Sequence, residues 1–345
     1  MKRKFPLVSI IIDNWNGKHF LKRCFDSLLT QSYPNYEVIV IDDASEDESL
    51  KVIKSVKSKA ESEGIEFLVI ENKKHVGFAI ANNQGIKSAK GKYLFFLNND
   101  TQVTKNFLFP LVKCLDENDQ LAAVQPKIKL FGNLNLLDEV VTYLTPLGIL
   151  YHVGFKEKDL GQFNQPRLTF SPKGAGFLVR KEILLKTGIF DEKFYCYFEE
   201  TDLCWRMWLN GWKIIYEPGS LIYHESGGML KKRDSAFRNY FSVKNRLNSL
   251  IKNLSLPFLF LILPLHMFLL FSLTFFYIMK GRGKDGLAIL RAIGWNIIQL
   301  NLTLKERMHI QKNIRKISDF ILFKEMFRVP PLRYFFRFFN LYEMV

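Results

Sequence analysis

The segment Tyr93–Asp100 (YLFFLNND) joins a short apolar run to three polar side chains. The apolar run predicts a buried strand. Asn98, Asn99 and Asp100 would then lie at the carboxyl edge of a sheet, where open α/β sheets bind ligands. Oxygen ligands at this edge suit a hard cation such as Mg²⁺ or Mn²⁺, which can in turn hold a diphosphate. A strand followed by an ordinary polar turn explains the same residues, because Asn and Asp are common in turns.

Two further carboxylate groups have the types and settings needed for chemistry. Asp42 ends a strand-like run, where it can accept hydrogen bonds from a ribose hydroxyl or a base N–H. Glu199, Glu200 and Asp202 stand among aromatic residues, a setting that raises carboxyl pKa values and favours a general base near neutral pH. Helix capping is the alternative role for both groups.

Three other residues have two roles open to them. Trp205 and Trp212 can stack on sugar faces or pack in the core. His224 follows a strand-like run after Pro218 and is either a structural histidine or a ligand.

Alternating strands and helices must position these residues. Such alternation predicts a parallel sheet built from right-handed crossovers, with the loops after its first, second and fourth strands on one edge. The predicted strands are Leu7–Ile12, Glu37–Ile41, Phe67–Ile70 and Tyr93–Leu97, and the helices between them cover residues 20–29, Glu48–Ala60 and Phe78–Ser88.

The middle of the chain is less regular. Residues 131–165 are rich in turn formers, and their pattern fixes no order. The elements expected around them are helices at Phe107–Leu115 and Asp202–Leu209, and strands at Ala122–Leu130, Phe177–Val179 and Ile214–Tyr216.

The net charge of +15 is concentrated in the last third of the chain. Residues 1–230 carry 29 Lys and Arg against 28 Asp and Glu, whereas residues 231–345 carry 20 against 6. A balanced soluble domain is therefore followed by a basic region whose partner is anionic, either a membrane surface or a nucleic acid.

Leu254–Met279 is an apolar run without a charged residue, and basic residues flank it on both sides. About 20 apolar residues can span a bilayer, so the run predicts a membrane segment that spans, lies on the surface, or forms a re-entrant hairpin bent at Pro264. A buried core helix is the alternative. The basic and aromatic C-terminal tail suits lipid headgroups and also single-stranded nucleic acid, but the adjacent apolar run favours the membrane.

The cysteines and the N-terminus predict a cytosolic setting. The four cysteines form no CxxC pair and no cluster with histidine, so reduced thiols are expected. The N-terminal apolar run is too short for a secretory signal and lacks a small-residue cleavage site.

The ordered motifs resemble the family 2 glycosyltransferases with the GT-A fold, and within them the rhamnosyltransferase-like group. The matching segments, within about residues 6–250, are VSIIIDNWNG, VIVIDDASEDES, VGFAIANNQGI, FLNNDT, GAGFLVRKEIL, FDEKFYCYFEETDLCWR and HESGG. The resemblance implies a GT-A, Rossmann-like and mostly parallel central sheet flanked by helices, with a C-terminal helical membrane-associated segment. It implies a nucleotide-sugar site formed by Asn14, Asn16, Asp42, Gly77, Phe78, Asn82, Asn98 and Asn99.

The resemblance also implies a reaction. Asp100 and His224 would hold the divalent cation, Glu200 would be the base of an inverting sugar transfer, and the acceptor side would include Glu199, Asp202, Trp205 and Trp212. Two positions differ from the family pattern. His75 replaces an Asn, and Glu200 replaces an Asp, so its carboxylate reaches one methylene farther.

Three regions are expected: a nucleotide-sugar half (1–105), an acceptor and catalytic half (106–245), and a basic, membrane-associated region (246–345). The expected partners are a UDP- or dTDP-sugar donor, with dTDP-rhamnose among the candidates, a glycan or lipid-linked acceptor, and the cytoplasmic face of the cell membrane. No nucleic acid is expected.

Other protein classes remain open on the sequence. A nucleotidyltransferase would need a Gly-rich basic phosphate loop, of which DNWNGK is a poor version. A non-catalytic membrane scaffold would fit the substituted His75 and Glu200. A processive synthase is disfavoured, because one hydrophobic run cannot build a channel and no QxxRW-like segment follows the acidic cluster.

Overall fold

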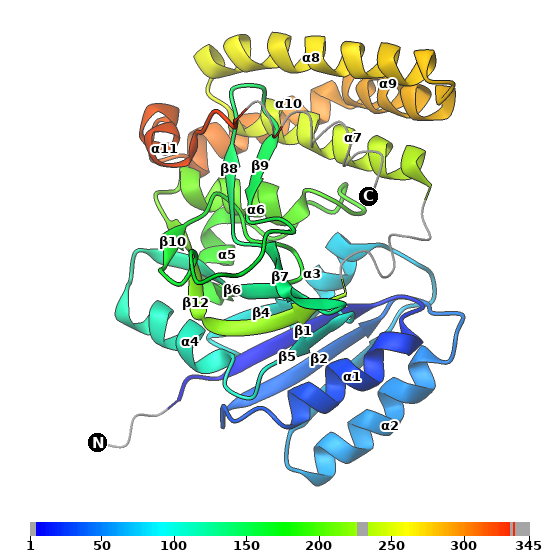
Figure 1. The fold of residues 1–345 in the computed structure, drawn as a ribbon, viewed down its shortest axis with the longest axis vertical. Helices are drawn as coiled ribbons and strands as arrows, with labels where there is room; N and C mark the ends of the chain where they lie inside the picture. Colours follow the sequence, from blue (N-terminus) through cyan, green and yellow to red (C-terminus); the bar gives the residue numbers. More distant parts are fainter. Residues whose placement is uncertain (1–4, 226–233, 332–333, 335–345) are drawn as a thin grey trace.

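The computed structural model describes residues 5–225, 234–331 and 334 of the chain. A ten-stranded sheet forms the centre of the protein, and a layer of helices from the C-terminal third lies over one end of it (Figure 1). Ser226, Gly227 and Gly228 of the HESGG segment lie outside the described residues.

The first half of the sheet is parallel, as the alternating pattern predicts. In the sheet, β1 lies between β2 and β4, and β3 pairs with the far side of β2. The elements are β1 (Val8–Asn14), α1 (Lys18–Leu29), β2 (Tyr36–Asp42), α2 (Ser49–Ser62), β3 (Glu66–Glu71), α3 (Phe78–Ser88) and β4 (Tyr93–Leu97).

The second half of the sheet is mixed. β11 is antiparallel to both β4 and β6, whereas β12 runs parallel to β6 and antiparallel to β5 and β10. Residues 131–165, for which the sequence predicts no order, contribute β7 to this sheet and the separate β8–β9 pair. The elements are β5 (Thr101–Val103), α4 (Leu108–Glu117), β6 (Leu121–Leu130), β7 (Asn133–Glu139), β8 (Val141–Leu144), β9 (Leu150–Val153), β10 (Arg167–Leu168), β11 (Gly176–Arg180), α5 (Lys181–Thr187), α6 (Glu199–Leu209) and β12 (Lys213–His224).

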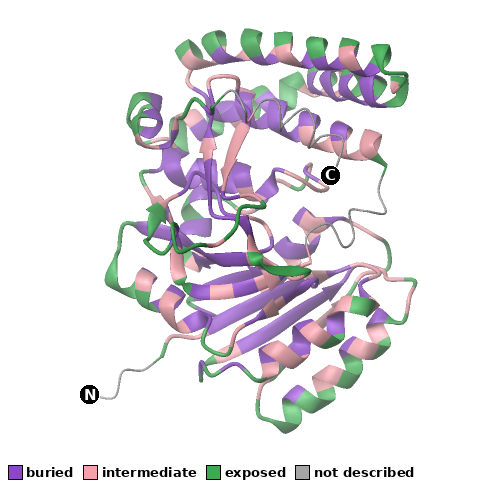
Figure 2. Ribbon diagram, in the orientation of Figure 1, coloured by how far each residue is buried: buried purple, intermediate pink, exposed green. Residues whose placement is uncertain are grey.

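The sheet separates two hydrophobic cores because successive strand residues point to opposite faces. In β1, Ile10 and Ile12 pack with residues of α1, α2 and α4, whereas Ile11 packs with residues of α3, α5 and α6. Burial on both faces explains why the parallel strands are continuous apolar runs rather than alternating ones. Figure 2 shows the central strands as the most buried part of the molecule.

The helical layer comprises α7 (Ser235–Asn253), α8 (Leu256–Met279), α9 (Gly283–Ile298), α10 (Leu300–His309), the π-helix η2 (Ile310–Ile314) and α11 (Asp319–Met326). By length and composition, α8 is one helix that could cross a bilayer, and 28% of its most apolar stretch is buried. The predicted hairpin bent at Pro264 is wrong, because α8 continues through this residue as one helix. Pro264 has no backbone N–H, so α8 lacks one hydrogen bond of its helical series at this residue. The expected boundary between residues 245 and 246 falls inside α7.

Candidate active site

The ends of β1, β2 and β4 bring four predicted nucleotide-binding residues together. In the parallel register Asn14 lies opposite Asp42. The Asn14 amide donates to Asp42 Oδ1 (3.0 Å) and accepts from the Asn99 amide (2.7 Å). The Asn16 side-chain oxygen accepts from the backbone N–H groups of Glu46 (2.7 Å) and Asp47 (3.2 Å). These bonds fix the loops of the edge before any ligand binds.

Asp43 organises the neighbouring loop. Its carboxylate accepts hydrogen bonds from the His75 ring (2.6 Å) and from the backbone N–H of Gly77 (2.8 Å). Burial alone would raise the pKa of Asp43, but these bonds lower it below its ordinary value. The indole ring of Trp15 stacks on His75 with 4.3 Å between the ring centroids. His75, which departs from the family pattern, therefore links the loops that follow β1, β2 and β3.

The α3 residues of the predicted nucleotide site have structural partners. Gly77 has a φ of +89°, and a side chain there would meet the Tyr195 ring at 2.5 Å, so glycine is required. Phe78 packs edge-on against Phe190, and the Asn82 amide donates to the Phe78 carbonyl at 3.0 Å. Phe78 thus packs α3 against the segment between α5 and α6, whereas the Asn82 hydrogen bond lies within α3.

Asp100 and His224 meet because β5 pairs antiparallel with β12, which sets Thr101 opposite His224. His224 Nε2 lies 3.3 Å from Asp100 Oδ1, and His224 Nδ1 lies 2.6 Å from Asp138 Oδ2. Burial alone would lower the pKa of His224, but the carboxylates of Asp100 and Asp138 raise it to about 10. Without a cation, the imidazole is therefore the charge that balances the two carboxylates.

The chemistry of this pair fits a divalent cation. Asp100 Oδ1 is buried and, among the described residues, has His224 Nε2 at 3.3 Å as its ion-pair partner but no well-formed hydrogen bond. In many metal sites the histidine binds the metal through one ring nitrogen while a carboxylate accepts a hydrogen bond from the other ring nitrogen. Within the described ranges no three His, Cys, Asp or Glu side chains are grouped to hold a metal. Asp100 and His224 could therefore supply two ligands to such a cation, and a diphosphate and water would have to supply the others. Asn98 lies beside them, and its backbone carbonyl accepts from the Thr101 hydroxyl (2.6 Å).

Glu200 lies at the start of α6 and is singled out by exposure. Ten of the eleven residues of α6 are buried, and Glu200 is the one that is not. Partial desolvation and the carboxylate of Glu139 raise the pKa of Glu200 to about 7, against the opposing effect of Lys173 and His152. This pKa is near the value at which a general base works best at neutral pH.

Glu199 has a different state from its neighbour. Burial, together with the carboxylates of Glu200 and Asp13, raises the pKa of Glu199 well above its ordinary value. Burial and the carboxylates of Asp43 and Asp42 raise the pKa of Asp13 in the same direction. Burial thus disfavours a full negative charge on Glu199, and the interaction with Asp13 connects α6 to the nucleotide edge.

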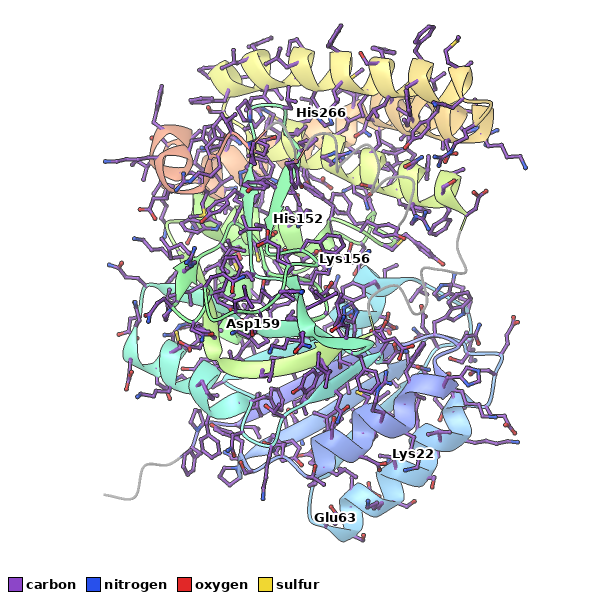
Figure 3. The ribbon with its side chains drawn as sticks, viewed as in Figure 1. Lys22, Glu63, His152, Lys156, Asp159 and His266 are labelled. Carbon is purple, nitrogen blue, oxygen red and sulfur yellow. The ribbon has the colours of Figure 1, made fainter. Side chains whose placement is uncertain are left out.

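Lys173 joins the cation pair to the proposed base. Its ammonium group lies 3.9 Å from Asp138 Oδ1 and 3.7 Å from Glu139 Oε2, and it acts electrostatically on Glu200. On its other side Glu139 contacts His152 Nδ1 at 2.9 Å, and His152 lies between the sheet and the helical layer (Figure 3). Asp100 and Glu200 are thus connected through one continuous group of charges.

The remaining predicted acceptor-side residues, Asp202, Trp205 and Trp212, have packing or hydrogen-bond partners within the protein. Asp202 is fully buried and accepts from the Ser249 hydroxyl (2.7 Å) and the Asn253 amide (3.0 Å) of α7. Trp205 is also fully buried, with its ring edge-on to Phe170. Asp202 is thus bonded to α7, and an acceptor-side role for Asp202 and Trp205 stays a prediction. The half-buried Trp212 packs against the core and donates to Asn210 Oδ1 (3.0 Å).

With this geometry described, comparison with known proteins identifies the family. The model of glycosyl transferase family 2 matches residues 9–188, more than half of the chain. The chain belongs to this family. The match covers β1 to α5, and therefore the nucleotide edge and Asp100.

Relatives and solved structures agree with the family 2 assignment. The chain is 28% identical over 242 residues to an uncharacterized glycosyltransferase of Rickettsia prowazekii, covering 70% of this chain and 68% of the relative. It is 25% identical to the poly-β-1,6-N-acetyl-D-glucosamine synthase of Staphylococcus epidermidis, covering 66% of this chain and 52% of the relative. The chain thus spans about half to two thirds of the length of these relatives.

Two solved structures share the fold at low sequence identity. S. aureus TarS 1–349 in complex with UDP-GlcNAc has a TM-score of 0.58 at 20% identity, covering 85% of this chain and 80% of that one. The Pyrobaculum calidifontis mannosyltransferase PcManGT, in complex with GDP-Man and Mn²⁺, has a TM-score of 0.56 at 16% identity, covering 89% and 86%. The GT-A fold of this family 2 chain is therefore established.

Several residues of the family 2 site are missed by sequence reasoning. They are Asp13, Asp43, Asp138, Glu139, His152 and Lys173. Asp138 and Glu139 interrupt an apolar run between Leu136 and Val141, and this buried acidic pair is the signal that could have revealed them.

Replacing Asp202 by alanine is expected to destabilise the protein by about 3–5 kcal/mol, since it leaves the buried Arg206 without a partner carboxylate and removes one of the carboxylates around the buried Lys252, which keeps Asp191. The free energy of unfolding in urea measures this loss. Asp119→Ala, at an exposed position, is the matched control. If Asp202→Ala unfolds like the control, Asp202 does not anchor α7 to α6.

Proposed function

We propose that this chain is an inverting, metal-dependent glycosyltransferase that moves a sugar from a UDP- or dTDP-sugar, with dTDP-rhamnose among the candidates, to a hydroxyl of a glycan or lipid-linked acceptor. The observation that carries the proposal is the continuous group of charges from Asp100 and His224, through Asp138 and Lys173, to Glu200. It places a candidate cation site and a candidate base with a pKa of about 7 in one system.

The donor would be held at the edge formed by Asn14, Asn16, Asp42 and Asn99. Asp42 has carboxylate oxygens suited to a ribose hydroxyl or a base N–H, and the hydrogen bonds among these residues pre-form the edge. Pre-formed groups lose less freedom when a ligand binds.

The transfer step would rest on Glu200 and on the residues around it. A Mg²⁺ or Mn²⁺ ion held by Asp100 and His224 supplies, when bound, positive charge against the developing negative charge of a diphosphate leaving group. Glu200 Oε takes the proton of the acceptor hydroxyl as that oxygen attacks from the side opposite the diphosphate. Burial raises the pKa of the neighbouring Glu199 well above its ordinary value, which disfavours a second negative charge beside Glu200.

The setting we propose is cell-surface polysaccharide synthesis at the cytoplasmic face of the membrane. A relative is named a poly-β-1,6-N-acetyl-D-glucosamine synthase, and residues 231–345 carry 20 basic against 6 acidic side chains. An anionic leaflet attracts such a region, and it would bring the catalytic domain to a lipid-linked acceptor.

A panel of nucleotide sugars tests the proposal. The full-length chain is incubated with UDP-, dTDP- and GDP-sugars, with Mn²⁺, with Mg²⁺ or with a chelator, and the released nucleoside diphosphate is measured. We expect metal-dependent release from a UDP- or dTDP-sugar and none with the chelator. Formation of a nucleoside triphosphate and a sugar 1-phosphate from the nucleotide sugar and added pyrophosphate would indicate a nucleotidyltransferase, and no turnover of any donor would indicate a non-catalytic scaffold.

A further inference from the structure

Helix α8 has two sides that face different surroundings. One stripe is buried, with residues at the spacing of a single helix face: Ile262, His266, Leu270, Leu273 and Tyr277. The opposite stripe is exposed and carries large apolar side chains, among them Phe260 (75% exposed), Phe268 (74%) and Phe275 (66%). We call this exposed stripe the outer face of α8. In Figure 2 the upper side of α8 is mainly green, and none of the described elements lies over it in this view.

The buried stripe of α8 belongs to a core that three helices share. Leu270, Leu273 and Tyr277 pack with Val243 and Leu247 of α7 and with Ile289, Ala292 and Ile293 of α9. Helices α8 and α9 approach so closely that a side chain added at Gly286 would meet the Thr274 carbonyl at 3.1 Å. His266, labelled in Figure 3, is fully buried and contacts the Leu147 carbonyl through Nδ1 (2.6 Å).

Helix α7, which lies beneath α8, is bonded to the catalytic domain. The Asn245 amide donates to the carbonyls of Cys196 (2.8 Å) and Tyr197 (2.7 Å), just before α6. The Asn239 amide donates to Asp285 of α9 at 2.9 Å. If α8 turned away to cross a bilayer, it would open the three-helix core and expose buried polar groups. The packing therefore holds α8 against the catalytic domain.

We propose that α8 lies in the plane of the membrane, with its outer face in the boundary between the headgroups and acyl chains of an anionic leaflet, and does not cross the bilayer. This inference deepens the proposed function, on which its link to a lipid-linked acceptor rests. Apolar helix faces enter this boundary by about 5–10 Å. Because α7 joins α8 to α6, the packing would also set the height of Glu200 above the leaflet.

Charge favours a lipid leaflet over a second copy of the chain. The outer face belongs to a helix without a charged residue, but Lys280, Arg282 and Lys284 follow it directly, within a region of net charge +14. Two copies meeting through this face would bring these positive charges together, whereas an anionic leaflet would neutralise them.

Vesicle flotation of the full-length chain tests the surface without any substrate. The probes are vesicles of phosphatidylcholine with phosphatidylglycerol and vesicles of phosphatidylcholine alone. We expect the variant Phe268→Glu with Phe275→Glu to lower binding to the anionic vesicles by about tenfold or more. The matched control, Leu160→Glu with Leu185→Glu, changes two exposed apolar residues of the catalytic domain and should bind like the parent chain. Equal binding by both variants would overturn the proposal.

A depth measurement separates a helix in the plane from a spanning one. An environment-sensitive fluorophore is attached to α8 in three separate variants, Phe260→Cys, Phe268→Cys and Phe275→Cys. In each variant the partly exposed Cys114 and Cys196 are replaced by serine. Lipids brominated at known depths should quench all three probes at the same shallow depth. Depths that pass through the bilayer centre from Phe260 to Phe275 would overturn the proposal in favour of a span.

Two controls complete the test. The oligomeric state of the parent chain is measured by sedimentation without vesicles. A dimer that dissociates in the variant Phe268→Glu with Phe275→Glu would overturn the proposal. Hydrolysis of a nucleotide sugar in solution is measured in parallel. If the chain binds vesicles but hydrolyses no donor, the proposed function is refuted, whereas the proposal that α8 binds the membrane still holds. Melting temperatures of both variants confirm that they fold.

Discussion

Replacing Glu200 by glutamine is expected to lower sugar transfer by about 10²–10⁴-fold, the usual contribution of a general base. Glutamine keeps the size of the side chain but cannot take the proton of the acceptor hydroxyl. Donor binding should be unchanged, because the nucleotide edge is formed by other residues such as Asn14 and Asp42. Transfer to an acceptor and titration of the donor into the protein measure the two effects separately.

The pH dependence of transfer gives a second readout for Glu200. A base must be unprotonated to act, and its pKa of about 7 means that transfer falls by about tenfold per pH unit on the acid side of this value. In Glu200→Gln this acid limb should disappear from whatever activity remains. Glu182→Gln, at an exposed position of α5, should keep both the rate and the limb. Wild-type transfer by Glu200→Gln would exclude Glu200 as the base.

Parallel strands explain how the sequence could predict the nucleotide edge. Their carboxyl ends meet at one edge of the sheet, so residues that directly follow or end apolar runs are neighbours whatever the details of packing. Asn14, Asp42 and Asn99 meet for this reason. The same local rules place β4 and α3 at their predicted bounds, Tyr93–Leu97 and Phe78–Ser88.

The charged residues between the cation pair and Glu200 could not be predicted in this way. Asp138 and Glu139 end β7, which pairs with β6 through register shifts, and Lys173 lies in the loop before β11. Antiparallel pairing across irregular connections depends on contacts between distant segments, and no short motif encodes it. The His224 contact with Asp100 was predictable only through the family resemblance.

Burial decided between roles that the sequence left open. The pattern of α6 fits a capping carboxylate and an acceptor-side carboxylate equally well, because both need an acidic residue in the first turn. Asp202 points to α7 and pairs with Lys252, whereas Glu200 stays partly exposed. Only the position of α7, which comes some 35 residues later in the chain, separates the two carboxylates.

Replacing Asp100 by alanine is expected to remove metal-dependent donor turnover, a loss of about 10³-fold or more, since a bound metal contributes several kcal/mol to charge stabilisation. The variant loses one of the two protein ligands that the described residues offer, and His224 alone cannot replace it. Donor hydrolysis as a function of Mn²⁺ concentration measures the loss, and binding of Mn²⁺ in the presence of UDP provides a readout that is independent of activity.

Asp138→Asn distinguishes direct ligation from positioning. Asp138 holds His224 Nδ1 at 2.6 Å and leaves Nε2 directed at Asp100, so its loss should weaken Mn²⁺ affinity by about 10–100-fold. High Mn²⁺ should therefore restore turnover to Asp138→Asn but not to Asp100→Ala, while Asp119→Ala on the surface keeps the parent dependence. If Asp100→Ala responds to Mn²⁺ as the parent chain does, the cation binds elsewhere. The group of charges from Asp100 to Glu200 would then not join a cation site to the base, and the proposal would fail.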